Sequence, residues 1–243
     1  LIKRMKETES KSAMGLIMNP QSGAILAMSS VPSFDNNNFS QYSISKHHSK
    51  VLTDQFEPGS TFKIVAATAS LAENIVALEQ EFSCENGEFD YFGSTIKDHE
   101  PYEQLTISQI IKYSSNIGII KIAEEVGSNS IYKYAKLFGF GTPTNFDMAG
   151  ETAGKIKPEK EWSRISIGQI SMGHEVAVNT LQLAVAFSAI ANNGFIVKPY
   201  IIDKIYNKDK NLEQKTMSLV KRQISSEKKI NEIKEMLRQV VLN

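Results

Sequence analysis

Residues 64–72 (IVAATASLA) place the strongest constraint on how this chain folds, because all of them are apolar or small hydroxyl residues. A helix over this stretch would be hydrophobic on every side, and such helices are usually buried. Lys63 comes directly before the stretch and is therefore expected to be buried with it in a core. A buried ammonium is costly unless it is paired, and desolvation lowers the pKa of a lysine toward the range where its amine accepts a proton.

Ser60 lies one helical turn before Lys63, in the segment Glu57-Pro58-Gly59-Ser60-Thr61-Phe62-Lys63. Residues three apart on a helix share a face, so the Ser60 hydroxyl and the Lys63 amine can come within hydrogen-bonding reach. Unpaired N–H groups and the helix dipole at a first turn would favour a developing negative charge. The pattern indicates a nucleophile with its base, although Ser-x-x-Lys also arises by chance in many proteins.

The composition excludes several kinds of function. The chain has 243 residues, 41% hydrophobic and 22% charged, which is enough for one sizeable core without a second domain. Its 27 basic and 27 acidic residues balance, so nucleic acid is not expected as a partner. The lone cysteine, Cys84, excludes an internal disulfide and a multi-cysteine metal site.

No apolar run in the sequence approaches the roughly 18 residues of a membrane span, and no signal peptide opens the chain. The first residue is Leu1 rather than methionine. We therefore expect the sequence to be part of a longer polypeptide, with residues 1–12 leading in from an upstream region.

A β-hairpin is predicted near the start of the chain. Residues 13–19 and 24–31 are two apolar runs joined by Pro20-Gln21-Ser22-Gly23, which is good turn chemistry. Because both runs are almost continuously apolar, we expect a sheet that is covered on both faces.

Two later segments are expected to be largely irregular. Residues 32–50 should form loop or short helix, and residues 79–103 an irregular connection with short strands. His47 and His48 lack a carboxylate or cysteine at ligand spacing, which favours a solvated loop over a metal site.

Helices dominate the rest of the prediction. Ser114-Ser115-Asn116 lie between the helix that Thr106 caps and the helix over 117–126. Taken alone, these three residues are most simply interpreted as a cap between consecutive helices. Residues 166–174 (SIGQISMGH) are expected to be flexible. The predicted elements are a helix capped by Thr106, a helix over 117–126, a helix from Ser128 or Asn129 that Gly139 ends, a helix over 179–192 with a capping box of Asn179 and Gln182, a strand over 196–206, a polar turn over 207–211 and an amphipathic helix over 225–242.

Taken together, these segments resemble the penicillin-binding protein transpeptidases, in particular the septal class B D,D-transpeptidases of bacterial cell division. Ser-x-x-Lys and a Ser-x-Asn element belong to the signature of that serine acyltransferase group. The resemblance covers about residues 13–243. Its motifs are Ser60-Thr61-Phe62-Lys63, Ser114-Ser115-Asn116, residues 19–28 (NPQSGAILAM), residues 54–59 (DQFEPG), Leu181-Gln182-Leu183-Ala184 and Ala191-Asn192-Asn193-Gly194.

The resemblance implies an α/β fold of the α+β type, the penicillin-recognising serine transferase or β-lactamase-like fold. An antiparallel sheet would be flanked by helices, and a mostly helical lobe would hold residues 114–116. Residues 13–243 would be a partial transpeptidase domain preceded by the lead-in of residues 1–12.

It also implies a covalent mechanism. Ser60 would attack the carbonyl of the penultimate D-Ala of a peptidoglycan stem peptide, and an amine of a neighbouring stem peptide would resolve the acyl-enzyme into a cross-link. Lys63 would activate Ser60, and Ser114 would relay a proton toward the leaving amine. Asn116, Gly59 and Thr61 would bind substrate. β-Lactams would acylate Ser60, and no metal or cofactor is required.

In the family, such a domain is carried by a protein anchored in the bacterial inner membrane, with the catalytic domain in the periplasm or on the outer face. The implied partners are stem peptides, β-lactams, a membrane-embedded peptidoglycan polymerase and division proteins. Two alternatives stay open. One is a serine β-lactamase or β-lactam sensor, and the other is a non-catalytic division scaffold.

One departure from the family pattern is important. The family places a Lys-Thr-Gly strand shortly after a helix like the one predicted over 225–242, and this sequence ends at Asn243 without it. Lys215-Thr216 is followed by Met217 and precedes that helix, so we do not accept it as the motif. We therefore expect a domain that stops before its third motif, with weak activity or none as it stands.

Overall fold

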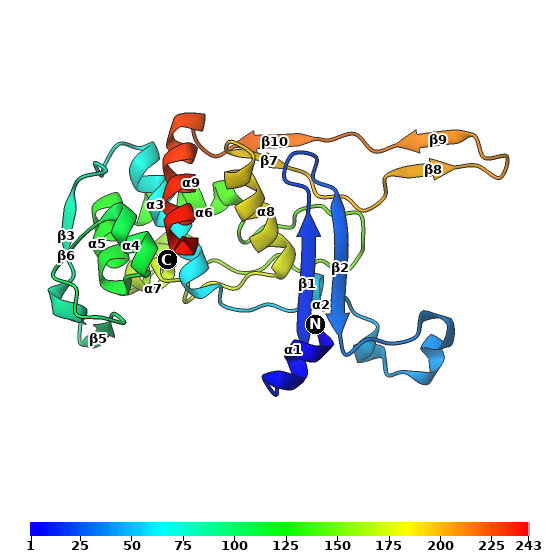
Figure 1. Cartoon of the computed structure of the whole chain (residues 1–243), viewed down its shortest axis with the longest axis horizontal. Helices are drawn as coiled ribbons and strands as arrows, with labels where there is room; N and C mark the ends of the chain where they lie inside the picture. The colour runs from blue at the N-terminus through cyan, green and yellow to red at the C-terminus, as the bar shows by residue number, and fades with distance from the viewer. Residues whose placement is uncertain (243) are drawn as a thin grey trace.

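The structure is a computed structural model, and it describes residues 1–242 (Figure 1). Its α-helices are α1 (Ile2–Glu7), α2 (Lys50–Thr53), α3 (Lys63–Ala72), α4 (Ile107–Tyr113), α5 (Asn116–Val126), α6 (Ser128–Phe138), α7 (Ser166–Ser171), α8 (Thr180–Ala191) and α9 (Glu227–Val241). Short 3₁₀ helices are η1 (Asn36–Gln41), η2 (Ile44–Lys46), η3 (Gly59–Phe62), η4 (Glu85–Gly87) and η5 (Glu159–Glu161).

The strands are β1 (Ala13–Met18), β2 (Ile25–Val31), β3 (Glu81–Ser83), β4 (Glu88–Tyr91), β5 (Ser94–Lys97), β6 (Gln104–Thr106), β7 (Phe195–Val197), β8 (Lys204–Tyr206), β9 (Leu212–Lys215) and β10 (Val220–Gln223). They form antiparallel pairs: β1 with β2, β3 with β6, β4 with β5, β7 with β10, and β8 with β9. The predicted hairpin and the short strands within 79–103 are thus confirmed.

The buried helix predicted behind Lys63 is the centre of the helical lobe. Every residue of α3 from Lys63 to Leu71 is buried, and α5, α6 and α9 pack around the helix. Figure 1 shows α3 to α7 gathered at one end of the molecule, with α9 beside them and α8 between this lobe and the β1–β2 hairpin. Burial on all sides follows from the apolar sequence, because no polar face is available to meet water.

Local sequence signals located most helix ends correctly. Thr106 and Gln109 form a capping box at α4, and Asn179 and Gln182 form another at α8. Gly139 ends α6 in the left-handed conformation. The predicted side-chain cap of α6 was wrong, because Gly127 stands at that position and Ser128 is already helical.

The amphipathic helix predicted over 225–242 is confirmed as α9. Its side chains Ile230, Ile233 and Met236 are buried, and the helix packs against α3 and α4. Ser226 begins the helix by accepting a hydrogen bond from the N–H of Lys229.

Three other expectations were wrong. The hairpin is not covered on both faces, since Ile17 of β1 and Leu26 of β2 are exposed. Residues 166–174 are not a flexible segment, because they include helix α7. The strand expected over 196–206 is split into β7 and β8.

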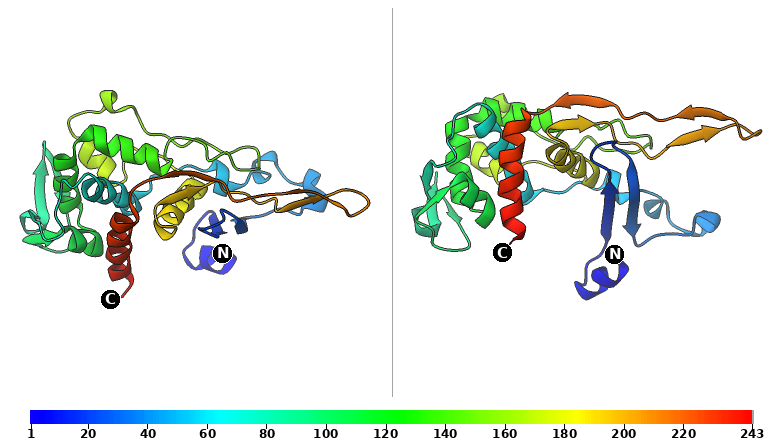
Figure 2. Two further views of the ribbon diagram at one scale, coloured as in Figure 1. Left: turned by 90° about the horizontal axis from the view of Figure 1, so that it is seen from above. Right: turned by 45° about the horizontal axis from the view of Figure 1, so that its top comes forward.

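The β8–β9 hairpin projects away from the rest of the molecule, as both views in Figure 2 show. Its strands are exposed along their whole length, and the turn between them includes a hydrogen bond from the N–H of Asn207 to the carbonyl of Asn211. None of the helices within residues 1–242 has the length and apolar character needed to cross a lipid bilayer.

Candidate active site

Ser60 is placed at the exposed beginning of the helix that carries Lys63. It belongs to the 3₁₀ turn η3, which runs directly into α3. Gly59, with φ of +57°, makes the sharp entry into this turn, a conformation that glycine adopts at little cost. The Ser60 hydroxyl thus stands at the amino end of a helix, where backbone N–H groups lack intrahelical partners.

Lys63 is only 2% exposed and directs its amine at the Ser-x-Asn segment. Its Nζ donates hydrogen bonds to Ser114 O at 2.5 Å, to Ser114 Oγ at 3.1 Å and to Asn116 Oδ1 at 2.9 Å. An ammonium has three N–H donors, so these acceptors match its full hydrogen-bonding capacity.

Ser114 connects the base to the nucleophile. Its Oγ donates to Ser60 Oγ at 2.9 Å while accepting from Lys63 Nζ. Within residues 1–242, Ser60 and Lys63 form no direct hydrogen bond, although the spacing allows one, and Ser114 Oγ joins them instead. The reason is that three oxygen acceptors on residues 114 and 116 hold the amine on their side.

The environment lowers the pKa of Lys63 to about 8. Burial is the main cause, because it penalises the charged amine, and the carboxylate of Asp98 opposes the shift by favouring the ammonium. A lysine in this range is a mixture of acid and base near neutral pH, which suits a group that must accept a proton and later return it.

The segment 114–116 reaches Lys63 because the chain changes direction there. Ser114 ends α4 in the left-handed conformation, with φ of +56°, and Ser115 caps α5 by accepting from the N–H of Gly118. The cap interpretation is therefore correct for Ser115. The break between α4 and α5 turns Ser114 and Asn116 toward the amine of Lys63.

Asp98 was missed by the sequence analysis. It follows β5, and its carboxylate accepts from Ser115 Oγ at 2.5 Å, from the N–H of Asn116 at 2.5 Å and from the N–H of Ile117 at 3.1 Å. An acidic side chain at a helix amino end satisfies orphan donors and the helix dipole. The local signal for this role was absent, because Asp98 caps α5 from the residue after β5 and not from the residue that precedes the helix.

Gly173 was also missed. A Cβ at this position would lie 2.1 Å from the carbonyl oxygen of Gly59, and the N–H of Gly59 donates to Gly173 O at 3.2 Å. Beside it, His174 Nδ1 lies 3.0 Å from Glu57 Oε2. The segment after α7 therefore supports the turn that presents Ser60.

A cavity of about 230 Å³ opens beside Ser60, Lys63 and Ser114. Its other walls are mostly apolar, with Ile64, Ile111, Phe187, Leu237 and Val240, and Thr61 also lines it. The Thr61 hydroxyl donates to Pro58 O at 2.7 Å, and Gly59 is not among the residues that line the cavity.

Lys215 lies far from this site. It is the last residue of β9, on the projecting hairpin (Figure 1). Thr216 is bonded within the hairpin region, to the carbonyl of Ile202. The Lys-Thr pair therefore contributes nothing to the cavity.

Comparisons with known proteins point to one family. The family model for the penicillin binding protein transpeptidase domain matches residues 13–243. A probable peptidoglycan D,D-transpeptidase, PbpC of Pseudomonas aeruginosa, is 36% identical over 186 residues, covering 76% of this chain and 33% of that protein. Stage V sporulation protein D of Bacillus subtilis is 30% identical over 235 residues, covering 94% of this chain and 36% of that protein.

Solved structures show the same fold. The apo crystal structure of penicillin binding protein 3 from Mycobacterium tuberculosis superimposes with a TM-score of 0.88 at 25% identity, covering 98% of this chain and 54% of that chain. The apo transpeptidase domain of penicillin-binding protein 3 from Burkholderia pseudomallei gives a TM-score of 0.84 at 26% identity, covering 99% of this chain and 66% of that chain. The chain spans about a third of the length of the curated relatives it matches.

Proposed function

Because this chain belongs to the penicillin-binding protein transpeptidase family, we propose that it carries the nucleophile, base and proton relay of a peptidoglycan D,D-transpeptidase. The observation that supports this most directly is the position of Ser114 Oγ, hydrogen-bonded to both Ser60 Oγ and Lys63 Nζ. A nucleophile, a base and a group that links them are the elements that covalent acyl transfer needs.

Acylation begins with Lys63 in its neutral form. As Ser60 Oγ attacks the carbonyl carbon of the penultimate D-Ala, its proton passes to Ser114 Oγ, and the Ser114 proton passes to Lys63 Nζ. The relay leaves Ser114 neutral and Lys63 as an ammonium. The developing oxyanion lies close to the amino end of η3 and α3, where unpaired N–H groups and the helix dipole stabilise negative charge.

Collapse of the tetrahedral intermediate reverses the proton path. Ser114 donates its hydroxyl proton to the nitrogen of the departing D-Ala and is reprotonated by Lys63. The acyl-enzyme on Ser60 is then attacked by an amine of a second stem peptide, which gives up its proton through the same relay. The new amide is the cross-link, and Ser60 and Lys63 return to their starting forms.

Asn116 takes a role in holding the base. Its Oδ1 accepts from Lys63, and its Nδ2 donates to Lys97 O at 3.0 Å, so both ends of the amide are engaged within the protein. For Asn116 to bind a substrate backbone, as the family resemblance implies, the bond to Lys97 has to open. Gly59 and Thr61 contribute by shaping the wall and the turn beside Ser60.

The wider setting of the activity is also proposed from the relatives. One of them is the peptidoglycan D,D-transpeptidase FtsI of Escherichia coli, 31% identical over 198 residues. We place the activity in septal wall synthesis, on the periplasmic or outer face of the bacterial inner membrane. A membrane-embedded peptidoglycan polymerase and division proteins are the partners in this proposal.

Penicillin labelling tests the proposal. The natural polypeptide that contains this sequence is treated with benzylpenicillin, digested and analysed by mass spectrometry, and the adduct is expected on the peptide that contains Ser60. An adduct on Ser114 instead would contradict the assignment of the nucleophile. Steady turnover of nitrocefin would favour a β-lactamase, and absence of any adduct on a folded protein would favour the non-catalytic scaffold.

A further inference from the structure

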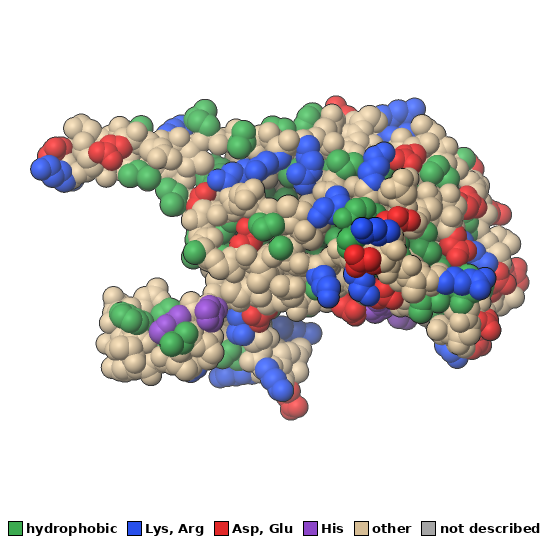
Figure 3. Space-filling view, turned by 180° about the vertical axis from the view of Figure 1, so that it is seen from behind, with side chains coloured by type: hydrophobic (Ala, Val, Ile, Leu, Met, Phe, Trp, Pro, Cys, Tyr) green, Lys and Arg blue, Asp and Glu red, His purple; other side chains and the backbone are tan. Residues whose placement is uncertain are grey.

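A second pocket, separate from the Ser60 cavity, lies where α6 ends and the β7–β10 pair passes over α8. Its volume is about 110 Å³, and its polar lining includes Thr144, Asn145, Gln182, Lys221 and Arg222. Figure 3 shows Lys and Arg side chains gathered where the projecting hairpin joins the body of the molecule. The transpeptidase mechanism makes no use of this pocket.

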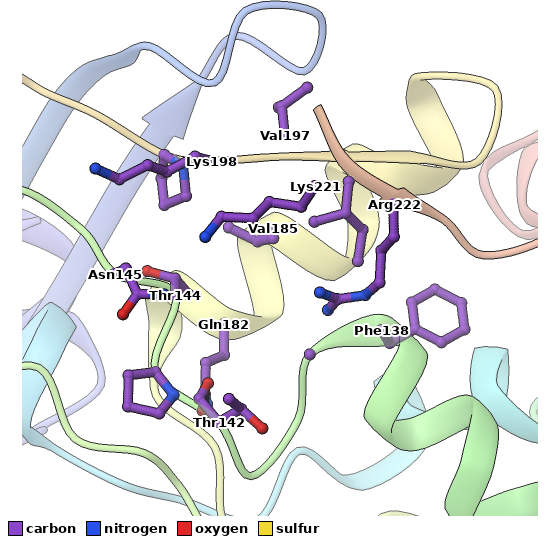
Figure 4. Close-up of a pocket in the computed structure, with 14 residues that line it drawn as sticks. Phe138, Thr142, Thr144, Asn145, Gln182, Val185, Val197, Lys198, Lys221 and Arg222 are labelled. Carbon is purple, nitrogen blue, oxygen red and sulfur yellow. Dashed lines mark hydrogen bonds between the residues drawn. The ribbon is translucent and has the colours of Figure 1, made fainter. Parts of the chain in front are cut away.

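A β-bulge brings two cations to the same pocket. Val220 pairs with Val197, and Arg222 pairs with Ile196, so Lys221 is an extra residue in β10. Successive residues of a regular strand point to opposite faces, and a bulge redirects the side chain at the point of insertion. Figure 4 shows the Lys221 ammonium and the Arg222 guanidinium directed into one space.

These cations lack acidic partners. Within residues 1–242, neither Lys221 nor Arg222 forms an ion pair, in contrast to Lys198, which lies 3.5 Å from Asp147. Arg222 Nε donates to Leu137 O at 2.6 Å, as expected for a cation at the carboxyl end of a helix. That bond uses one of its five N–H donors and leaves the outer nitrogens facing the pocket.

The opposite wall offers an unused hydroxyl. Thr144 Oγ1 is buried and has no hydrogen-bond partner within the described part of the chain, although nearly all buried polar groups have one. Thr144 lies across the pocket from Arg222 (Figure 4). A ligand that accepts from both walls would pair this hydroxyl and the two cations together.

We propose that this pocket binds a phosphate group, with Lys221, Arg222 and the Thr144 hydroxyl as its ligands. A tetrahedral phosphate has oxygens directed to both walls, whereas the two oxygens of a carboxylate lie on one side of its carbon. Charge-assisted hydrogen bonds from Arg and Lys to phosphate are among the stronger ones in proteins. The group is either free phosphate or the end of a phosphate monoester.

Calorimetric titration with sodium orthophosphate, and separately with glycerol 3-phosphate, tests the proposal at constant ionic strength maintained with chloride. Binding of orthophosphate alone would assign the site to the free ion. Binding of both would assign it to a monoester end. If neither binds at 10 mM, a concentration chosen as roughly the upper limit for a useful anion site, the proposal is wrong.

Two variants link the binding to these residues. Lys221→Gln, at an exposed position, is expected to raise the Kd for phosphate about tenfold, which is the effect of losing one charge-assisted hydrogen bond. Thr144→Val is expected to weaken binding while leaving the melting temperature without phosphate unchanged or higher, because it removes an unpaired buried hydroxyl. Lys208→Gln, in the turn between β8 and β9, is the matched charge control and should bind as the wild type does. Equal weakening by Lys208→Gln would show a nonspecific charge effect and overturn the site.

Discussion

The hydroxyl of Ser114 donates a hydrogen bond of 2.9 Å to the hydroxyl of Ser60, although the two serines are 54 positions apart in the sequence. The same Ser114 accepts from Lys63 through both its Oγ and its carbonyl. One residue at a helix junction therefore connects a surface nucleophile to a buried amine. Its loss should separate the two chemically while leaving both in place.

Ser114→Ala is accordingly expected to lower the rate of acylation by penicillin by about 100-fold or more, the usual contribution of a positioned proton-transfer group. Ser115→Ala is the matched control, because Ser115 caps α5 and should mainly cost about 1 kcal/mol of stability. Acylation kinetics with a fluorescent penicillin and urea unfolding separate the two effects. A Ser114→Ala rate within threefold of wild type would argue against the relay.

Lys63→Arg should abolish acylation although the positive charge is kept. Arginine does not surrender its proton in a protein, so it can pair with Ser114 but cannot serve as a base. Lys121→Arg, at a surface lysine paired with Glu85, should leave the rate unchanged. Retention of a tenth of the normal rate by Lys63→Arg would show that Lys63 acts only through its charge.

The pH dependence of acylation should follow the titration of Lys63. With its pKa lowered to about 8, the neutral amine becomes the main form only above that value, so the rate should rise between about pH 7 and 9. Stability gives an equilibrium check with a defined sign. Between pH 8 and the ordinary lysine pKa of 10.5, the unfolded chain binds the proton that the folded chain has lost, so folding stability should rise with pH.

Comparison of the wild type with Lys63→Met by urea unfolding at several pH values measures that stability difference. Between pH 8 and 10.5, the free energy of unfolding of the wild type is expected to rise by up to about 3 kcal/mol relative to that of the variant. A flat acylation profile together with a constant stability difference would place the pKa of Lys63 outside this range.

Asp98→Asn should change both the rate and its pH dependence. The amide is a weaker acceptor for the N–H groups of Asn116 and Ile117, which hold the segment that carries Ser114 and Asn116, so acylation should fall about tenfold or more. Loss of the carboxylate also removes the charge that raises the pKa of Lys63, so the rising limb of the profile should move to lower pH. A lower rate with an unmoved limb would assign Asp98 a purely structural role.

Gly173→Ala should disturb the turn that carries the nucleophile. A Cβ at residue 173 would lie 2.1 Å from the Gly59 carbonyl oxygen, and φ there is +87°. Gly93→Ala is the matched control, because φ is +83° and nothing lies within 4 Å of its added Cβ. Both variants should lose about 1–2 kcal/mol to backbone strain, but only Gly173→Ala should lose more than that and acylate slowly. Equal acylation by the two variants would show that the contact with Gly59 does not position Ser60.

Features encoded in neighbouring residues were predictable. The apolar run after Lys63 gave the buried helix correctly, since burial on all sides is a property of the run itself. The capping boxes at Thr106 and Asn179 were found for the same reason, because the cap and its partner are three residues apart. The spacing of Ser60 and Lys63 also predicted them as a pair, and their catalytic roles stay a prediction.

Features that depend on distant partners were missed. Asp98 reaches α5 from just after β5, and Gly173 contacts Gly59, which is distant in sequence, so neither leaves a local pattern. The small residues of 166–174 suggested flexibility. A Cβ at Gly168, however, would lie 2.5 Å from the Tyr91 ring, so a small residue is needed there for close packing.

The break in the strand expected over 196–206 has a local cause. Pro199 follows β7 and lacks an N–H, so the ladder cannot continue through it. The missing Ser60–Lys63 bond has a different cause. Spacing along a helix shows which side chains share a face, but it does not show which acceptors arrive from elsewhere to compete for them.

The left-handed backbone of Ser114 has a consequence for how this protein could evolve. A serine held at φ of +56° is less stable there than glycine, or than asparagine, whose short side chain tolerates this conformation. Selection for heat resistance alone, with no demand on activity, would thus be expected to replace Ser114 early. Persistence of serine under such selection would show that the hydroxyl is needed as well as the fold, so thermal stability and activity would place opposite demands on residue 114.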